Sequence, residues 1–420
     1  MAEKAGKGWI QVRVLWIAYG CSLQSGEANP NLTARHERVM IRHGADRVKL
    51  AVAFMADDLH RDFLERDGIS YYPVHADMRI GIREEEWQKT SEELMRVIGE
   101  FRPDVIHCFG AEWPYGRIAA ETDVPVIIHM MGFLNAYCEA LDIAHGYAKE
   151  ASLYLRIKRS VKAIVRRVSN ASEEQSAGFE RMVMSCNRYY MGRTEWDKSI
   201  VKYYSPGAKY FYAPEAVKKS VYDAAGRWDY HFNGRLRLFT HSIGDERKGN
   251  EIILRTAKVL KEVVGIDFIW KVAGDTKDIL TRAKHLGISC TQLGIELLGM
   301  LNDKEIIKEI KDADVYVFSS VIDNSPHSIC EAQLIGCPVI ATNVGGVPQL
   351  IDNGRTGFLY PYNEPHTLAF LIADIYRDGK LLREISRNEV KEAVKRNDPK
   401  SIADTLIDIY KEVIEDHDKS

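Results

Sequence analysis

Residues 319–346 read SSVIDNSPHSICEAQLIGCPVIATNVGG, and this stretch decides the fold of the C-terminal half. It begins at the end of an apolar run, 314–319, which predicts a buried strand of a parallel sheet. Ser325 is predicted as the N-cap of a helix, with Pro326 at its first position and Gly336 at its C-terminal end. The apolar residues after the helix predict another strand. The stretch therefore forms a strand–helix–strand unit.

The start of this predicted helix is suited to bind an anion or a ring of hydroxyls. The first-turn N–H groups, near His327 and Ser328, have no partner within the helix, and the helix dipole adds positive potential. Asp323 precedes the expected cap by two residues, and Glu331 lies one to two turns into the helix. Because carboxylates accept several hydrogen bonds, these two can hold the two ends of an elongated ligand. A nucleotide sugar fits, with hydroxyls at both ends and phosphates between.

Strands and helices are expected to alternate along both halves of the chain, which predicts an α/β fold with two doubly wound parallel sheets. The expected strands are 12–18, 48–54, 70–74, 105–108, 126–129, 188–191, 236–241, 267–273, 315–319 and 338–341. The expected helices include 83–99, 112–121, 251–264, 303–312 and 326–335. Two such domains face each other across a cleft at the carboxyl ends of their strands, where ligands of these folds bind.

Length and pattern predict two domains, since 420 residues exceed one ordinary core. We expect an N-terminal Rossmann-like domain over 1–215 and a C-terminal one over 236–397. The polar, less periodic stretch 216–235 is interpreted as the linker. An amphipathic helix within 398–420 is expected to return to the N-terminal domain.

Composition excludes several classes of protein. The formal net charge of -3 gives no global sign of nucleic acid binding. The seven cysteines are scattered, odd in number and never in a CxxC pair, which argues against disulfides and a structural zinc site and favours a reducing cytoplasm. The N-terminal residues resemble no signal peptide, and no apolar run approaches the roughly 20 residues that span a bilayer. We therefore expect the protein to stay in the compartment where it is made.

A family resemblance rests on the spacing of particular residues. They are Asp323-x7-Glu331, Ala332, Gly336, Cys337-Pro338-Val339-Ile340-Ala341-Thr342, Gly345-Gly346, Asn353-Gly354-x2-Gly357-Phe358-Leu359, Val272-Ala273-Gly274 and Leu298-Gly299. Together they resemble the donor-binding signature of retaining GT-B glycosyltransferases of family 4, the glycosyl transferases group 1. The resemblance covers about 236–377 and is loose over the N-terminal half. It implies a GT-B fold with an acceptor-binding N-terminal domain and a C-terminal domain that binds a nucleotide sugar, in UDP or GDP form.

The resemblance also implies roles for single residues. Glu331 would hold the ribose, and Asp323, where the family usually has Glu, would contact the transferred sugar. Backbone contacts to sugar and phosphate would come from Asn324, Ser325, Pro326, His327 and Ser328. Lys248 would neutralise the leaving diphosphate. Ile243 stands where the family usually has an arginine, so the clamp is one cation short unless Arg247 substitutes.

N-terminal candidates come from strand ends and one loop. Gly20 and Gly26, after the first strand, would let backbone approach the phosphates. His129 ends the fifth expected strand and resembles the histidine that the family carries beside the anomeric carbon. Glu112 and His107 are weaker candidates, assigned to the acceptor.

The expected activity is metal-independent, retaining hexosyl transfer without a cofactor, to a glycan, glycolipid or polysaccharide precursor. Asp312-Ala313-Asp314 resembles the metal-binding DxD of another glycosyltransferase fold, but it leads into a buried strand and is interpreted as structural. The basic stretch 149–167 is an ordinary amphipathic helix or a peripheral contact with an anionic membrane. Two alternatives stay open: a nucleotide-sugar epimerase or hydrolase on the same fold, and a catalytically weakened sugar-nucleotide-binding subunit.

Overall fold

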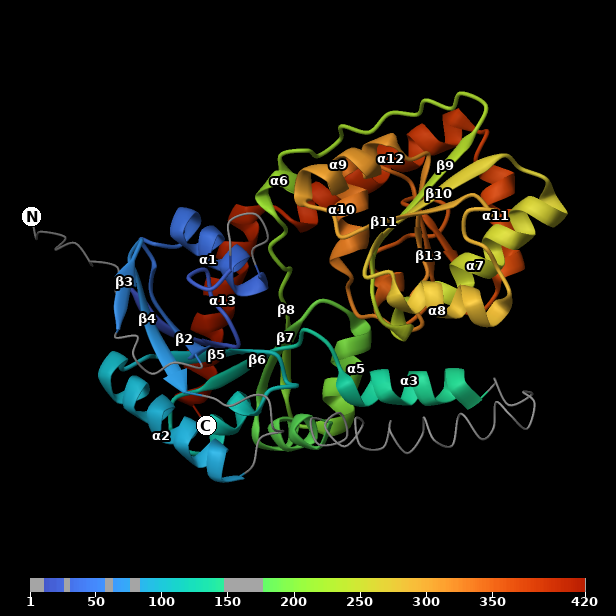
Figure 1. The fold of residues 1–420 in the computed structure, drawn as a ribbon. Coiled ribbons are helices and arrows are strands. Elements are labelled where there is room, and N and C mark those ends of the chain that lie inside the picture. Colours follow the sequence, from blue (N-terminus) through green and yellow to red (C-terminus); the bar gives the residue numbers. More distant parts are fainter. Residues whose placement is uncertain (1–10, 26–30, 57–62, 76–83, 147–176, 420) are drawn as a thin grey trace, which may run out of the picture.

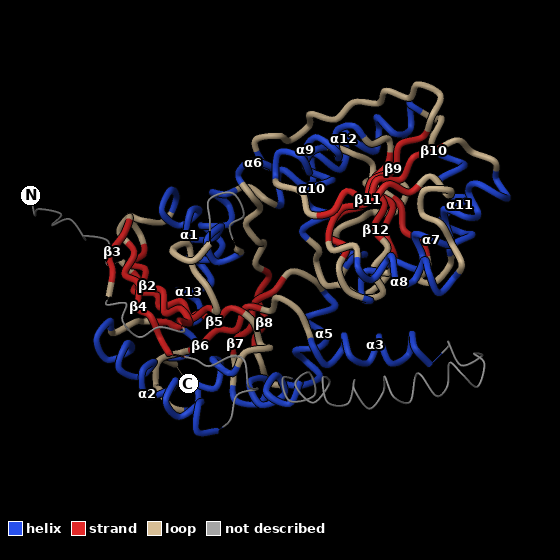
Figure 2. Tube along the Cα trace, in the orientation of Figure 1, coloured by secondary structure: helices blue, strands red, loops and turns tan. Residues whose placement is uncertain are grey.

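The molecule contains two α/β halves, each built on its own sheet (Figure 1, Figure 2). The computed structural model describes residues 11–25, 31–56, 63–75, 84–146 and 177–419. In the described residues one sheet has eight strands in the order β3-β4-β2-β1-β5-β6-β7-β8, and the other has six in the order β11-β10-β9-β12-β13-β14. All neighbouring strands pair in parallel except β3 and β4. The predicted class, two doubly wound α/β domains, is confirmed.

The N-terminal sheet is buried on both faces because helices cover each of them. Its strands are β1 (Val12–Ala18), β2 (Val48–Ala56), β3 (Leu64–Arg66), β4 (Ile69–His75), β5 (Val105–Phe109), β6 (Val126–His129), β7 (Tyr189–Gly192) and β8 (Lys209–Tyr212). The helices are α1 (Leu32–His43), α2 (Glu84–Phe101), α3 (Leu134–Gly146) and α5 (Glu195–Tyr204). Along β1, Val14 and Trp16 face one core while Leu15 and Ile17 face the other. This explains why the strands read as continuous apolar runs.

The C-terminal domain repeats this architecture. Its strands are β9 (Leu236–Ile243), β10 (Phe268–Gly274), β11 (Ile295–Gly299), β12 (Val315–Phe318), β13 (Val339–Thr342) and β14 (Phe358–Tyr360). Its main helices are α7 (Asn250–Val259), α8 (Lys277–Leu286), α9 (Asp303–Asp312), α10 (His327–Ile335), α11 (Pro365–Ile375) and α12 (Gly379–Arg396). One tight turn, η2 (Glu246–Lys248), precedes α7. Among the described helices, none is long and apolar enough to cross a membrane.

The last helix, α13 (Pro399–His417), packs into the core of the N-terminal domain. Ile402, Leu406 and Tyr410 share a buried cluster with Trp16 of β1. Figure 1 shows α13 beside α1, far from the other C-terminal helices, and the two helices are in contact. The chain therefore crosses from the C-terminal domain back to the N-terminal one before it reaches this helix.

Much of the stretch expected as a linker is bound to the C-terminal domain. It contains the short helix α6 (Lys219–Tyr222), and Val221 and Trp228 lie in the C-terminal core. The backbone N–H of Trp228 donates to the carbonyl of Ile335 at 3.0 Å, and its Nε1 donates to the carbonyl of Ala313 at 2.7 Å. Although the segment is polar, these contacts attach it to the C-terminal domain, so it is not an unattached linker.

Two local predictions were wrong. Helix α10 begins at His327, and Pro326 is the N-cap, with an extended ψ of 127° and no capping side-chain bond. Ser325 therefore does not cap the helix, and its carbonyl instead accepts a hydrogen bond from Arg193 at 2.8 Å. The helix expected over 112–121 covers only Pro114–Ala120 and is a 3-10 helix, η1, which begins after the extended Trp113.

Gly249, which separates η2 from α7, is predicted to be irreplaceable. Its φ is 65°, and a Cβ atom there would lie 1.8 Å from the carbonyl oxygen of Ser319. Gly265 has a similar φ of 75°, with nothing within 4 Å of the same position. Gly265→Ala should lower the free energy of unfolding by about 1–2 kcal/mol, the left-handed backbone cost alone. Gly249→Ala should lower it further, because backbone must move. Urea unfolding of the two variants checks this, and equal losses would contradict it.

Candidate functional site

The loop before α10 is held against the N-terminal domain. Asn324 lies between two side chains at the start of α5: its Oδ1 accepts from Thr194 Oγ1 at 2.7 Å, and its Nδ2 donates to Asp197 Oδ2 at 2.9 Å. Arg193 Nη1 donates to the carbonyl of Ser325 at 2.8 Å. Asn324 and Ser325 are buried as a result. The residues predicted to bind a donor thus lie where the two domains touch.

Glu331 lies inside α10 and is bound to a histidine that sequence analysis missed. Its Oε2 atom is 2.9 Å from Nε2 of His241 on β9, and both side chains are buried. Burial alone would raise the pKa of Glu331, but the hydrogen bond to His241, with smaller contributions from Lys218 and Arg35, lowers it to about 2. Glu331 is therefore ionised at neutral pH and accepts hydrogen bonds only. His241 lies near the carboxyl end of β9, the strand beside β12, and a polar residue at that place in an apolar strand is the signal that would have found it.

Lys248 and Asp323 form an ion pair at the mouth of the same region. Lys248 Nζ is 3.0 Å from Asp323 Oδ2, and the side chains are 28% and 16% exposed, so a ligand can still reach the pair. The other carboxylate oxygen of Asp323 accepts the N–H of Asn324 at 3.0 Å. Gly345 packs against this loop so closely that a Cβ atom would lie 2.2 Å from the carbonyl oxygen of Asp323. The Gly-Gly turn of the sequence signature therefore fixes the position of the loop.

The cations expected near Lys248 are placed differently. Arg247 pairs with Asp245 through two hydrogen bonds, of 2.6 and 3.1 Å, and its guanidinium lies 5.4 Å from the ring centroid of Tyr137 in α3. Its charge is thus largely compensated. Ile243 is part of the C-terminal core and supplies no polar group. The first-turn N–H groups of His327 and Ser328 lack a partner within α10 and add positive potential there.

A buried cluster of histidines includes His107 in the middle of β5 and His129 at the end of β6. His107 and His129 are both 0% exposed, with His107 Nε2 3.2 Å from His129 Nδ1. His129 Nε2 is 3.6 Å from Oε1 of Glu215, a carboxylate that sequence analysis missed. Glu215 is bound by Arg193 Nη1 at 2.6 Å and by His327 Nε2 at 3.1 Å. Glu215 thus joins the N-terminal histidines to the start of α10.

Burial and charge set the protonation of this cluster. Burial lowers the pKa of His129 to about 3, since desolvation outweighs the attraction of Glu215. Burial likewise lowers the pKa of His36, in α1, to about 4 and that of His107 well below its ordinary value. Burial alone would raise the pKa of Glu215, but Arg193 and then His327 hold it well below the usual range. The cluster therefore combines neutral histidines with an ionised carboxylate.

The remaining candidates are less closely connected to the site. Glu112 is half-buried, burial raises its pKa to about 7, and its Oε2 atom has no hydrogen-bond partner among the described residues. A Cβ atom on Gly20 would meet the Asn31 amide at 2.9 Å, so that loop is tightly packed. Gly26 and the stretch 149–167 lie outside the described residues.

The DxD-like sequence is part of the C-terminal core. Asp314 is fully buried and accepts hydrogen bonds from Arg237 at 2.6, 2.8 and 3.2 Å. In the part of the chain that the structure describes, no group of three or more His, Cys, Asp or Glu side chains is arranged to hold a metal ion.

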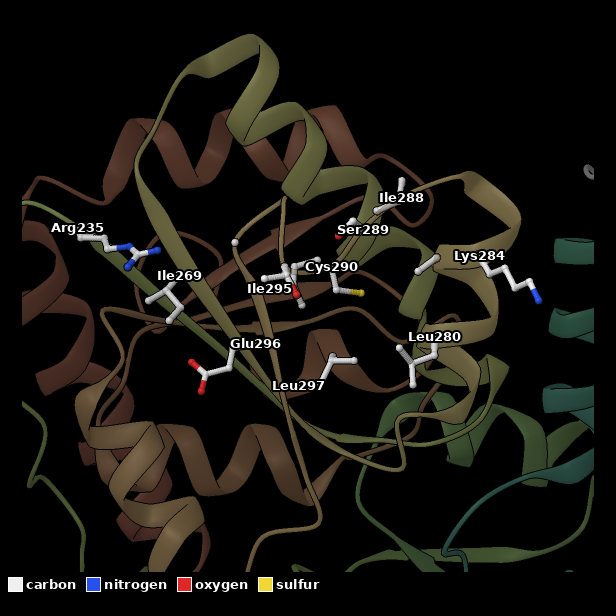
Figure 3. A pocket seen from close by; sticks show the side chains of 13 residues that line it. Arg235, Ile269, Leu280, Lys284, Ile288, Ser289, Cys290, Ile295, Glu296 and Leu297 are labelled. Carbon is white, nitrogen blue, oxygen red and sulfur yellow. The ribbon is translucent and has the colours of Figure 1, made fainter.

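A groove of about 780 Å³ lies at the far edge of the C-terminal sheet (Figure 3). It runs between α8 and β11, and its walls include Leu280, Ile288 and Leu297. None of the residues that bind one another around α10 lines it. The groove is therefore distinct from the candidate site.

The C-terminal half of the chain is similar in sequence to known glycosyltransferases. Residues 233–392 match the family described as glycosyl transferases group 1, a match that includes Lys248, Asp323 and Glu331. An uncharacterized glycosyltransferase of Methanocaldococcus jannaschii is 27% identical over 227 residues, or 49% of this chain. That alignment spans only 56% of the relative's own length.

Solved structures define the fold across both domains. Sucrose-phosphate synthase from Thermosynechococcus elongatus matches with a TM-score of 0.68, covering 96% of this chain and 99% of that chain at 14% identity. Anabaena HepE in complex with UDP-glucose matches with a TM-score of 0.60, covering 98% and 100% at 15% identity. The chain therefore has the GT-B fold, as the sequence predicted. Within it, the C-terminal domain carries the group 1 sequence pattern.

The buried histidines predict how stability depends on pH. Their folded pKa values lie below the unfolded value of 6.5, so unfolding takes up protons and stability is lost as pH falls below 6.5. Each such histidine contributes a slope of about 1.4 kcal/mol per pH unit well below 6.5. His129→Gln should reduce this slope by about 1.4 kcal/mol per pH unit, which is the contribution of one proton. Urea unfolding at pH 5.5 and pH 4.5, where an unfolded histidine is almost fully protonated and folded His129 is not, measures it.

The control is His366→Gln, because the side chain of His366 is 64% exposed. This variant should keep the wild-type slope. Identical slopes in all three proteins would show that His129 is not held neutral by burial.

Proposed function

We propose that the protein is a retaining glycosyltransferase that moves a sugar from a nucleotide-diphosphate sugar, in UDP or GDP form, to a glycan, glycolipid or polysaccharide precursor. One observation carries the proposal: Asp323, paired with Lys248, lies just before α10, and Glu331 lies within α10, inside the segment that matches the group 1 family. The complex of HepE, a protein of the same fold, with UDP-glucose favours a UDP donor.

Each charged group has a place in this reaction. Ionised Glu331 accepts hydrogen bonds from the ribose hydroxyls, which are donors. Asp323 would bind hydroxyls of the transferred sugar. When the sugar–phosphate bond breaks, positive charge develops on the sugar and the electron pair stays on the diphosphate. Lys248 and the N–H groups at the start of α10 stabilise that negative charge, each by about a few kcal/mol in a site that excludes water.

The Lys248–Asp323 ion pair affects how a donor would bind. Lys248 is already neutralised by Asp323 at 3.0 Å. A diphosphate that takes over the lysine releases this carboxylate to accept sugar hydroxyls. Both residues thereby change partners in one event, and neither charge is left uncompensated.

Metal ions, cofactors and the cellular location are also part of the proposed function. We propose that the fixed cation and N–H groups make a metal ion and any cofactor unnecessary, and that the enzyme works in the cytoplasm. Contact of 149–167 with an anionic membrane, suited to a lipid-linked acceptor, belongs to the same proposal.

Donor binding is tested by thermal unfolding with UDP, GDP, ADP and CMP sugars. One donor should raise Tm saturably, since a ligand at a hundredfold excess over its Kd stabilises the native state by about 2.7 kcal/mol. Glu331→Ala should abolish the shift. Glu296→Ala is the matched control, because Glu296 is exposed on β11 and lines the distant groove. Absence of a shift with every donor would overturn the proposal.

Transfer itself is tested with the donor that binds. Lys248→Ala should lower kcat by about 100-fold, the effect of losing one charge-stabilising group, while changing donor Kd much less. The anomeric configuration of the product, read by NMR, should equal that of the donor. Activity should persist in EDTA. An inverted product would contradict the retaining mechanism.

One alternative rests on a specific observation. The absence of a second cation at Ile243, together with the shorter Asp323, suits a catalytically weakened subunit that binds a sugar nucleotide. Slow hydrolysis of the bound donor in the absence of acceptor separates the two functions. A binding subunit should show none.

A further inference from the structure

Tyr410 of α13 contacts the histidine cluster although it comes from the other end of the chain. Its hydroxyl lies 2.7 Å from Nδ1 of His107 and 3.0 Å from Nε1 of Trp16. All three side chains are 0% exposed. A buried chain of contacts therefore runs from Trp16 through Tyr410 and His107 to His129.

The direction of these hydrogen bonds follows from which atoms carry hydrogen. The indole Nε1–H of Trp16 only donates, so the Tyr410 oxygen accepts from it. The Tyr410 hydroxyl then has one hydrogen to place, and among the described residues its remaining neighbour is Nδ1 of His107. His107 accepts at Nδ1, which leaves its hydrogen on Nε2, facing Nδ1 of His129 at 3.2 Å.

The opposite direction leaves groups unsatisfied. If His107 donated from Nδ1, the Tyr410 hydrogen would have no acceptor among its described neighbours. His129 would then carry its hydrogen on Nδ1 and turn a bare Nε2 toward Glu215 Oε1 at 3.6 Å. Two lone pairs would face each other in a buried place, which is costly.

We infer that Tyr410 and His107 are positioning residues that fix His129 as the tautomer with its hydrogen on Nε2, directed toward Glu215 and the start of α10. The His129 Nε2–H consequently has no hydrogen-bond partner among the described residues, with Glu215 Oε1 3.6 Å away, and it is available to donate to an oxygen atom of a ligand at the domain boundary. His129 does not act as a general base, because its only other nitrogen accepts from His107. The low pKa that burial gives His129 agrees with a ring that stays neutral.

His36 supports this arrangement from the other side. Its Nδ1 lies 3.0 Å from the carbonyl of Leu32, which only accepts, so its hydrogen is on Nδ1. Its Nε2 then accepts the N–H of Ala216, next to Glu215, at 3.4 Å. The ring stands edge-on to His129, with centroids 5.8 Å apart. Neither nitrogen of His36 therefore competes for His129.

The test is the tautomer itself, read by NMR of the full-length protein with ¹⁵N-labelled histidine. Protonated and bare ring nitrogens have well-separated ¹⁵N shifts, and His129→Gln and His107→Gln assign the signals. In the wild-type protein at neutral pH, both rings should carry hydrogen on Nε2. A hydrogen on Nδ1 of His129 would overturn the inference, whether or not the protein transfers sugar.

The Tyr410→Phe variant tests whether the Tyr410 hydroxyl fixes the tautomers of His107 and His129. It keeps the ring and removes the hydroxyl, so a second set of His107 and His129 signals should appear. The kinetic arm rests on the proposed function: kcat should fall about tenfold, while donor KM stays within twofold.

The control is Tyr189→Phe. The Tyr189 hydroxyl bonds Asp416 of α13 at 2.9 Å, so this variant loosens the same helix without touching the histidines. Its histidine spectrum and kcat should match the wild type. If the two variants give the same spectrum, α13 has only a structural role and the inference fails.

Discussion

Asn324 connects the two domains through both ends of its amide. Its oxygen accepts from Thr194 and its nitrogen donates to Asp197, so the two bonds fix the orientation of the amide. Because Asn324 follows Asp323 directly, the same bonds fix the carboxylate that pairs with Lys248. Gly345 and Gly346 complete the constraint, since a Cβ atom at either would collide with the backbone of Asp323 or Asn324. The position of the donor loop thus depends on contacts made by the N-terminal domain.

On both sides of the interface between the domains, a buried carboxylate is bound to basic side chains. Ionised Glu331 is bound to His241, and ionised Glu215 is bound to Arg193 and His327. These carboxylates are buried, and removing a partner would leave an uncompensated charge, which is strongly destabilising. Lys248 and Asp323 are the more exposed pair and can exchange partners with a ligand. The buried pairs therefore fix the geometry of the site, while the Lys248–Asp323 pair can change when a ligand binds.

Local signals in the sequence predicted the sheets well, because strands buried on both faces read as apolar runs. Expected strands 12–18 and 126–129 agree with β1 and β6 residue for residue. Three-residue strands such as β3 carry too few residues for a pattern. The site was predicted where one segment carries it, around α10. Arg193 and Glu215 were missed because their importance comes from contacts with Ser325 and His327 of the other domain, which no local pattern shows.

The location of α13 has a consequence for the order in which the protein acquires its structure during synthesis. The ribosome delivers the N-terminal sheet first, yet the cluster around Trp16 lacks Ile402, Leu406 and Tyr410 until the last segment of this chain emerges. All the strands of the C-terminal sheet precede α13, so that domain can complete its core earlier. Domains often fold from the N-terminus onward during translation. Here the N-terminal sheet is synthesised before the C-terminal sheet but completes its core after it, because α13 follows both.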